Sequence, residues 1–477
     1  MTHDPGRQRP GLTLAVLALS GLAYSLLQSL VAPALPAIQH QLHASESGVT
    51  WILTAYLVSA SVATPVLGRL GDIHGKERVL VCILVVLGAG TVVSALATSL
   101  PVMILGRVVQ GAGGGIFPLA FGIIRDEFPH ERVPGSIGLM SAILGIGSGA
   151  GIVMAGVIVD NLSYHWLFWI PLVAVGVATV ATALFVPESP IKAKARIGWT
   201  AAALLSVGLA AVLLAISEAS DWGWGSTRTL GLAALGVGVL VVWVRVELRS
   251  EQPLVDMRVM RLRTVSMTNL VGFLLGMGMF SSFILIPQLV ELPASTGFGF
   301  GSSVTAAGLF LAPATVMMLL AGSLAGPLER RFGSKLLLTA GAACSAGAFA
   351  MLAAAHETHA EIYVATALLG VGIGLAFAAM ANLIVASVPA DQTGVATGVN
   401  TIARTLGGAL GSQVAASVLT ATAVASTGLP AERGFTISFA LAAGLLAVSV
   451  VVAMAIPGRD PRRRKKADDL MEAGVRL

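Results

Sequence analysis

The chain has 477 residues, of which 56% are hydrophobic and 11% are charged. Soluble domains carry about 25% charged residues, so this composition excludes an ordinary water-soluble globule and predicts a polytopic membrane protein. The net charge of +5 at pH 7 does not indicate nucleic-acid binding, because the basic residues fall in short segments between long apolar runs. Cys82 and Cys344 lie inside apolar runs and predict neither a disulfide framework nor a metal site.

Fourteen apolar segments follow one another along the chain, each about 20 residues long and therefore able to cross a hydrocarbon core of roughly 30 Å. They fall near residues 12–36, 49–68, 79–98, 101–124, 136–159, 166–187, 198–217, 229–247, 265–290, 304–326, 336–355, 362–388, 395–421 and 435–457. Membrane barrels instead show alternating segments of about ten residues. We therefore predict an all-α polytopic membrane protein with fourteen transmembrane helices, the first of them a retained anchor rather than a cleaved leader.

The distribution of basic residues predicts that both termini are cytoplasmic. In that orientation 25 of the 29 Lys and Arg residues lie in cytoplasmic segments, whereas the outer loops hold only Arg228 and Arg433. The basic run at 462–466 would then lie beside anionic lipid headgroups. We expect a multi-pass protein of the inner cell membrane whose partners include membrane lipids and no nucleic acid.

An internal repeat relates two parts of the chain at a shift of about 258 residues. The loop GRLGDIHGKER (68–78) is echoed by GPLERRFGSK (326–335), which aligns Gly68 with Gly326 and Gly75 with Gly333. Two six-helix halves therefore flank an extra pair of helices, an architecture found in secondary transporters. The predicted organisation is an N-terminal tail at 1–11, a six-helix half at 12–190, two inserted helices with a cytoplasmic linker at 191–263, a second half at 264–457 and a basic tail at 458–477.

Four motifs in this framework resemble those of the major facilitator superfamily, and more narrowly its 14-helix drug/proton antiporter branch. They are the loop at 68–78, LGRVVQGAGGG (105–115) in span 4, WILTAYLV (51–58) entering span 2, and ARTLGGALG (403–411) in span 13. The resemblance covers nearly the whole chain. It implies the major facilitator fold, with two six-helix bundles that rock about a central cavity.

The resemblance also implies a conformational latch in the loop after span 2. The glycines allow a tight turn, and an acid there can accept hydrogen bonds from helix N-termini. The implied latch residues are Gly68, Asp72, Gly75, Lys76 and Arg78, with Gly326 and Gly333 as their counterparts in the repeat.

Two arginines lie within predicted spans, where a charge costs roughly 2.5–3.5 kcal/mol on the insertion scale. The resemblance assigns Arg107 to proton coupling, and Arg404 is a candidate for the substrate site. None of the 24 acids lies near the middle of a span, and Leu27 and Gln28 stand where the branch commonly has an Asp. The remaining candidates for a coupling acid all lie near span ends, and of these Glu218 and Glu291 are favoured because each follows an uninterrupted apolar helix. They are Asp72, Asp160, Glu218, Asp221 and Glu291.

Span 5 keeps the glycine spacing of the branch's antiporter motif at Gly138, Gly147, Gly151 and Gly156. Small residues allow close helix approach, and we expect span 5 to pack on span 8 or its equivalent at the interface of the halves. Ile152 and Ala155 replace the proline and one glycine of that motif, which weakens the antiporter interpretation.

Polar and aromatic residues within spans are candidates for a substrate-binding surface. The predicted set is Tyr24, Gln28, Tyr56, Gln110, Asn269, Phe273, Phe280, Asn400 and Arg404. A cavity that holds arginines and no acid would favour neutral or anionic amphiphiles over permanent cations.

Together these features predict a secondary transporter that exports drugs or amphiphilic metabolites by alternating access and is driven by a proton gradient. We expect no enzymatic activity, no cofactor, no bound metal and a monomeric state. A proton symporter or facilitator for a small organic solute is the alternative. A channel or receptor is disfavoured because the longest outer loops have only about a dozen residues, too few for an extramembrane sensor domain.

Overall fold

The computed structural model describes residues 10–44, 46–129, 131–189, 198–251, 253–424 and 427–457. Most of the predicted N-terminal tail, the boundary at 190–197 and the basic C-terminal tail lie outside the described residues. Within them the regular structure is helical, and a single isolated β-bridge joins Ala423 and Pro430. This confirms the predicted all-α class.

The helices of the first half correspond to spans 1 to 6. They are α1 (Pro10–Ser29), α2 (Val31–Gln41), α3 (Glu46–His74), α4 (Lys76–Ala95), α5 (Leu100–Gln110), the 3₁₀ turn η1 (Gly111–Gly115), α6 (Ile116–Glu127), α7 (Val133–Asn161) and α8 (Trp166–Phe185). Span 4 is thus split by four glycines into α5 and α6, which continue one another through η1.

The inserted pair of long helices is α9 (Trp199–Ser217) and α11 (Thr227–Arg249). Each is followed by a short helix, α10 (Ala219–Trp222) and α12 (Met257–Met260). The second half contains α13 (Arg263–Glu291), η2 (Ala294–Thr296), α14 (Val304–Phe310), α15 (Ala312–Phe332), α16 (Ser334–Ala354), α17 (His359–Ser387), η3 (Ala390–Gln392), α18 (Thr393–Ala421) and α19 (Glu432–Met454).

Thirteen helical segments of the described residues are long and apolar enough to cross a membrane. The fourteenth predicted span is α18, a helix of 29 residues that is less apolar because it carries Asn400, Arg404 and Gln413 among many Gly and Thr. Its polarity is tolerated because α18 packs against α13, α3 and α6 in the interior of the bundle.

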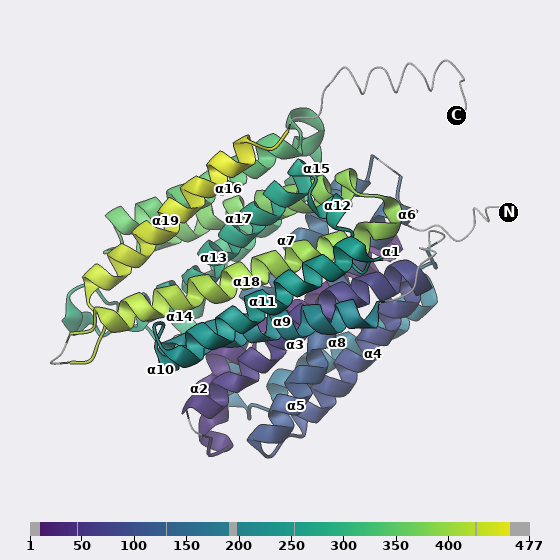
Figure 1. Ribbon diagram of the computed structural model, residues 1–477. Helices are drawn as coiled ribbons and strands as arrows, with labels where there is room; N and C mark the ends of the chain where they lie inside the picture. The colour runs from purple at the N-terminus through teal and green to yellow at the C-terminus, as the bar shows by residue number, and fades with distance from the viewer. Residues whose placement is uncertain are drawn as a thin grey trace, which may run out of the picture.

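The two halves lie side by side, with the first half (purple to blue) below the second (green to yellow) in Figure 1. Their most extensive contacts are between α7 and α15 and between α3 and α18, and α17 also packs on α7 and α18 on α6. The inserted helix α9 packs against both α3 and α18, and α11 packs on α9. The N-terminus of α1 and the C-terminus of α19 lie on the same side of the bundle (Figure 1).

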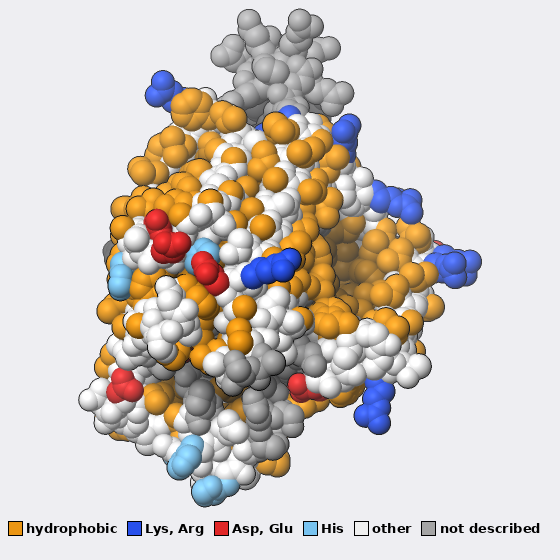
Figure 2. Space-filling view, turned by 90° about the vertical axis from the view of Figure 1, so that its left-hand side faces the viewer, with side chains coloured by type: hydrophobic (Ala, Val, Ile, Leu, Met, Phe, Trp, Pro, Cys, Tyr) orange, Lys and Arg blue, Asp and Glu red, His pale blue; other side chains and the backbone are white. Residues whose placement is uncertain are grey.

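On the face of the bundle shown in Figure 2, hydrophobic side chains cover much of the surface and charged side chains are few. Along α8, Val173, Val177, Val180 and Leu184 are all more than half exposed and recur at helical spacing. A contiguous apolar face of this kind is suited to lipid rather than to water.

Candidate functional site

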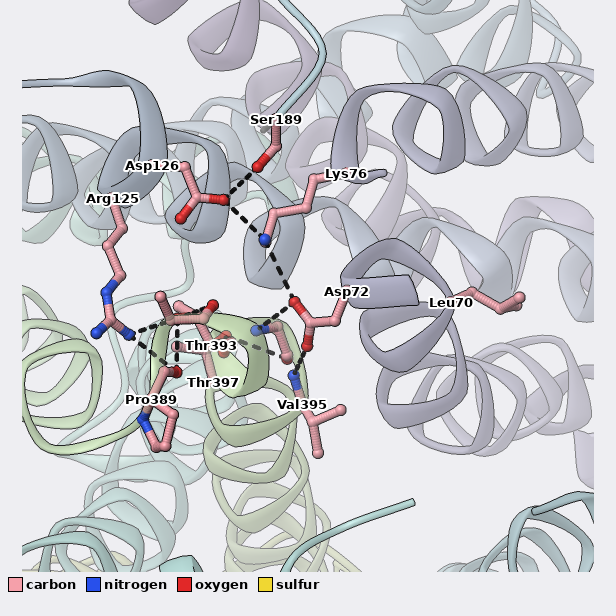
Figure 3. Close-up of polar contacts among 12 residues, drawn as sticks. Leu70, Asp72, Lys76, Arg125, Asp126, Ser189, Pro389, Thr393, Val395 and Thr397 are labelled. Atoms are coloured by element: carbon pink, nitrogen blue, oxygen red, sulfur yellow. Dashed lines mark hydrogen bonds and ion pairs between the residues drawn. The ribbon is translucent and has the colours of Figure 1, made fainter. Parts of the chain in front are cut away.

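A buried cluster of charges lies where α3 ends and α4 begins, at the end of the bundle that carries the two chain ends. The Lys76 Nζ atom lies 2.8 Å from Asp126 Oδ2 and 3.5 Å from Asp72 Oδ1, and all three side chains are 0% exposed. The hydroxyl of Ser189 also donates to Asp126 (Figure 3). These four residues all belong to the first half, so the cluster is internal to that half.

Asp72 extends this cluster to the second half. Its carboxylate accepts hydrogen bonds from the backbone N–H groups of Gly394 (3.4 Å) and Val395 (3.3 Å), in the first turn of α18 (Figure 3). A carboxylate at a helix N-terminus satisfies free N–H groups and interacts favourably with the helix dipole. The approach requires glycine, because a Cβ atom on Gly68 would lie 2.7 Å from the carbonyl oxygen of Gly394.

Arg125, at the end of α6, makes a second connection to the same corner of the other half. Its guanidinium donates to Thr393 Oγ1 (2.6 Å) and to the carbonyl oxygens of Pro389 (3.2 Å) and Val388 (2.8 Å). These acceptors lie at the C-terminus of α17 and the start of α18, where carbonyl groups lack intrahelical partners. Arg125 and Asp72 together therefore hold the ends of both helices, and we call these contacts the α18 gate.

The repeat places a related crossing between α15 and α7. A Cβ atom on Gly326 would lie 2.5 Å from the Cα atom of Gly135. Asn382 donates to the carbonyl oxygen of Pro134 (3.3 Å) and to Glu329, and Arg330 donates to the carbonyl oxygen of Glu131 (3.4 Å). Hence both crossings close the same end of the bundle.

The turn glycines of the two repeats occupy conformations that side chains rarely adopt. Gly75 has a φ of 107° and Gly333 a φ of 80°. Each separates two long helices, α3 from α4 and α15 from α16, within a single residue. A residue with a Cβ atom would be strained there.

Arg78 lies outside the α18 gate, although the resemblance groups it with Asp72 in one latch. It pairs with Glu188 at 3.0 Å within the first half, and the two side chains are 66% and 35% exposed. It follows Lys76 by two residues, which turns its side chain about 200° around the helix axis. Conversely, Arg125 and Asp126 were not predicted, although their charges at the end of span 4 are a signal that could have identified them.

A small cavity lies between the two halves. Its lining comes from α6 and α7 of the first half and from α17 and α18 of the second, which are equivalent helices in the repeat. The lining residues are Phe117, Phe121, Ser141, Leu144, Phe377, Ala381, Thr397, Asn400, Thr401 and Arg404. Its volume of about 10 Å³ is enough for roughly one water molecule. Sites for drug-sized ligands have about 300–1,000 Å³, so the cavity must widen before it can hold such a ligand.

Two of the predicted substrate residues, Asn400 and Arg404, line this cavity directly. Asn269 supports one of them, since the Asn400 amide donates to Asn269 Oδ1 at 3.1 Å. The ring of Tyr24 packs edge-on against Phe117, with 6.1 Å between centroids. These four predicted residues therefore lie at or beside the cavity.

The other predicted substrate residues lie elsewhere. Gln28 is not part of the lining, and Tyr56 and Gln110 contact Arg107 instead. The backbone of Phe273 and the ring of Phe280 pack on the glycines of α18. The aromatic lining residues Phe117, Phe121 and Phe377 were not predicted, although the spacing of Phe117 and Phe121 by four residues places them on one helix face.

Arg107 is fully buried and joins three segments of the first half. It donates to the carbonyl oxygens of Leu27 and Ile52, each at 3.3 Å, and to Gln110 Oε1 at 2.7 Å. Its guanidinium also lies 4.0 Å from the centroid of the Tyr56 ring. Among the described residues it forms no ion pair, and its Nη2 atom has no hydrogen-bond partner. A buried charge without a counter-charge is therefore held by carbonyl dipoles and an aromatic face alone.

The structure does not bring the candidate coupling acids to Arg107 or to the cavity. Glu218 and Glu291 lie at the ends of α9 and α13. Burial and the neighbouring Asp221 raise the pKa of Glu218 above its usual value. Asp160, near the end of α7, accepts a hydrogen bond from Thr305 of the other half at 2.9 Å. In the described part of the chain, His, Cys, Asp and Glu do not gather in threes as a metal site would require.

The glycines of span 5 bring α7 close to both halves. Cβ atoms on Gly147 and Gly151 would clash with Ser25 and Ser29 of α1, and one on Gly138 would lie 2.6 Å from the carbonyl oxygen of Gly322 in α15. Gly156 faces Thr305 of α14 in the same way. The interface partner of span 5 is therefore span 10, formed by α14 and α15, whereas span 8 (α11) packs on α9.

Comparison with known proteins places this arrangement in a family. Residues 17–412 match the Major Facilitator Superfamily. The chain is 28% identical over 401 residues to the multidrug transporter protein MdtP of Bacillus subtilis, covering 83% of this chain and 73% of MdtP. It is also 28% identical over 405 residues to the tetracenomycin C resistance and export protein of Streptomyces glaucescens, covering 83% and 74%.

Solved structures share the fold at low sequence identity. The human organic anion transporter MFSD10 superimposes with a TM-score of 0.69 at 17% identity, covering 94% of this chain and all of that one. The proton:xylose symporter XylE gives a TM-score of 0.65 at 14% identity, covering 94% and 96%. At these identities the likeness concerns the fold.

Proposed function

The chain belongs to the major facilitator superfamily of membrane transporters, and we propose that it exports amphiphilic small molecules in exchange for protons. The names of two relatives, a multidrug transporter and an antibiotic resistance and export protein, support export as the direction. The observation that carries the proposal is the cavity, which is lined by equivalent helices of both halves and lies behind the α18 gate.

We place the gated end in the cytoplasm, because the basic residues concentrate in the loops of that end. A ligand from the cytoplasm then enters when α18 separates from Asp72 and Arg125. The division of contacts favours this motion: Lys76 lies 3.5 Å from Asp72 within the first half and remains with it when the halves separate. The Asp72 carboxylate is therefore never left without a cation, so the cost of opening is limited.

Export against a gradient needs a source of free energy. Each proton that enters at a negative-inside potential supplies about 2.3 kcal/mol per 100 mV. Arg107 supports coupling, since an uncompensated charge in a low-dielectric interior responds strongly to any nearby change in charge. The ring of Tyr56, against which it lies, is 6.4 Å from that of Tyr24, which packs on the cavity residue Phe117.

The test is transport in liposomes that contain an interior pH dye. Purified protein is reconstituted, and amphiphiles of positive, zero and negative charge are added in turn. Proton movement opposite to substrate flux supports antiport. Movement in the same direction supports the alternative, a symporter, and flux without any proton movement supports a facilitator. Absence of flux for every compound contradicts the proposal.

We also propose that one chain is the transporting unit, since its two repeated halves form the two sides of the cavity. Light scattering of the purified protein in detergent measures this directly. A mass of one 48.6 kDa chain is expected after subtraction of the detergent. A stable dimer whose dissociation abolishes transport would contradict it.

A further inference from the structure

The charge of the cavity lining comes from one side chain. Arg404 is the sole ionisable residue among the ten that line it, and it is partly exposed to that space. Among the described residues Arg404 has no ion pair and no hydrogen-bond partner, whereas Asp72 of the α18 gate has both and Arg125 has three hydrogen bonds. A cation in an apolar interior is costly unless a counter-charge or a set of acceptors compensates it.

The geometry of Arg404 leaves its hydrogen-bonding edge available. Its guanidinium carbon lies 4.5 Å from the centroid of the Phe377 ring. The guanidinium of Arg is a planar fork of N–H donors, and an aromatic ring beside it attracts its charge without using up the hydrogen bonds that the fork can donate. Such a fork matches the two oxygens of a carboxylate and forms short charge-assisted bonds with them.

The rest of the lining suits a flat aromatic body. Phe117, Phe121 and Phe377 supply aromatic faces from both halves, and Leu144 and Ala381 add apolar surface. Asn400 is held in place by its bond to Asn269. No acidic residue is part of the lining to attract a cation, so the wall combines aromatic surface with a single positive charge.

We propose that the cavity binds aromatic amphiphiles that carry one anionic group, with the anion on Arg404 and the rings against Phe117, Phe121 and Phe377. This substrate class rests on the proposed export function, because it concerns the ligand of the same cavity. The widening that admits the ligand leaves the Arg404–Phe377 pair intact, since α17 and α18 both belong to the second half.

The test uses three probes that share one scaffold and differ in charge: 2-naphthoate, methyl 2-naphthoate and (2-naphthylmethyl)trimethylammonium. Equilibrium binding to the purified protein and flux in liposomes are measured for each. We expect 2-naphthoate to bind at least tenfold more tightly than the ammonium probe. Arg404→Gln should remove that preference while leaving the ester unchanged, and Arg404→Lys should retain part of it because the charge remains without the fork.

The matched control is Arg228→Gln, which removes an exposed arginine at the start of α11, outside the cavity. It should preserve the order of the three probes. The order of the three affinities in the wild-type protein is measured without any variant. It therefore tests the proposed substrate class even if Arg404→Gln fails to fold.

The outcomes separate the two proposals. Anion-selective binding without flux supports the substrate class and contradicts export. Flux of all three probes with equal affinity, or an unchanged order in folded Arg404→Gln, overturns the substrate class and leaves export standing. A folded wild-type protein that binds none of the probes also overturns the class.

Discussion

Among the described residues of the first half, Asp72 is the side chain that accepts hydrogen bonds from the N-terminal N–H groups of α18. Asp72→Asn removes its charge, which weakens the interaction with the helix dipole and leaves Lys76 with one carboxylate instead of two. The ion pair with Lys76 is present in both states, so the closed state loses only the charge-assisted part of the bonds to α18, which for hydrogen bonds to charged groups is about 1.5–3 kcal/mol. We expect the closed state of the gate to lose most of that stabilisation and transport in proteoliposomes to fall at least tenfold.

Arg78→Gln is the matched control for this prediction. The resemblance places Arg78 in the same latch, but its ion pair with Glu188 is exposed. Exposed pairs contribute about 0–1 kcal/mol, so transport by this variant should stay within about twofold of wild type. An effect as large as that of Asp72→Asn would instead place Arg78 in the gate.

Glu218 gives a prediction about pH. Burial and Asp221 raise its pKa, so the folded protein binds this proton more tightly than the unfolded chain does. The ionised carboxylate therefore destabilises the folded protein once the pH exceeds the ordinary pKa of a glutamate. The penalty vanishes in acid, where Glu218 is protonated in both the folded and the unfolded chain. Glu218→Gln should raise the unfolding temperature in detergent at neutral pH and have no effect near pH 4. A constant difference at every pH would contradict this.

Cavity residues could be predicted from the sequence where a polar side chain lies in an apolar span. They were missed where the only distinguishing feature is which way an apolar side chain points. Arg404 and Asn400 stand out because polar groups are rare in apolar spans. Phe117, Phe121 and Phe377 do not, because helices that are apolar on every face carry no sign of which face points inward. Arg125 contacts residues more than 260 positions away, which no local pattern encodes.

At the scale of helices, glycines set how closely α3 and α18 approach. Gly68→Ala places a Cβ atom 2.7 Å from the carbonyl oxygen of Gly394, so the two backbones must separate. We expect a more open gated end, measured as a longer spin-label distance between the C-terminus of α3 and the N-terminus of α18. Gly176→Ala in α8 is the control, because nothing lies within 4 Å of its Cβ position. It should leave the distance unchanged and stabilise the helix by about 0.5–1 kcal/mol.

The linker after α11 shows how an element can differ from its sequence signal. Its many arginines predict a solvated cytoplasmic loop, yet Leu254 and Val255 are buried. The Glu247 carboxylate accepts their backbone N–H groups at 2.9 and 3.4 Å, which fixes the turn. Both side chains pack in one cluster with Val395 and Ile402 of α18. The inserted helices and their linker therefore cover the seam between the halves. The distribution of basic residues along the sequence does not predict this role.

At the scale of the whole molecule, the repeat supplies two crossings that are equivalent in backbone and different in chemistry. At α3 and α18 a carboxylate contacts backbone N–H groups directly, whereas at α15 and α7 the contact with Pro134 is made by the Asn382 amide beside Glu329. The Asp72 crossing has the larger electrostatic contribution, because its charged hydrogen bonds are buried, whereas the bond from Arg330 to Glu131 at the other crossing is exposed and longer than usual. The halves should therefore separate as rigid units whose equilibrium is set mainly at α18.

If the two halves move as rigid units, access to the cavity should increase from one side of the membrane when it decreases from the other. In a chain with Cys82→Ala and Cys344→Ala, Thr401→Cys places one thiol in the lining. Adding Gly68→Ala should raise its rate of reaction with a membrane-impermeant maleimide from the cytoplasmic side and lower the rate from the outer side. Arg249→Cys, exposed at the end of α11, should react at the same rate in both backgrounds. If both rates at Thr401→Cys rise together, the substitution has loosened the bundle, and the two halves do not alternate.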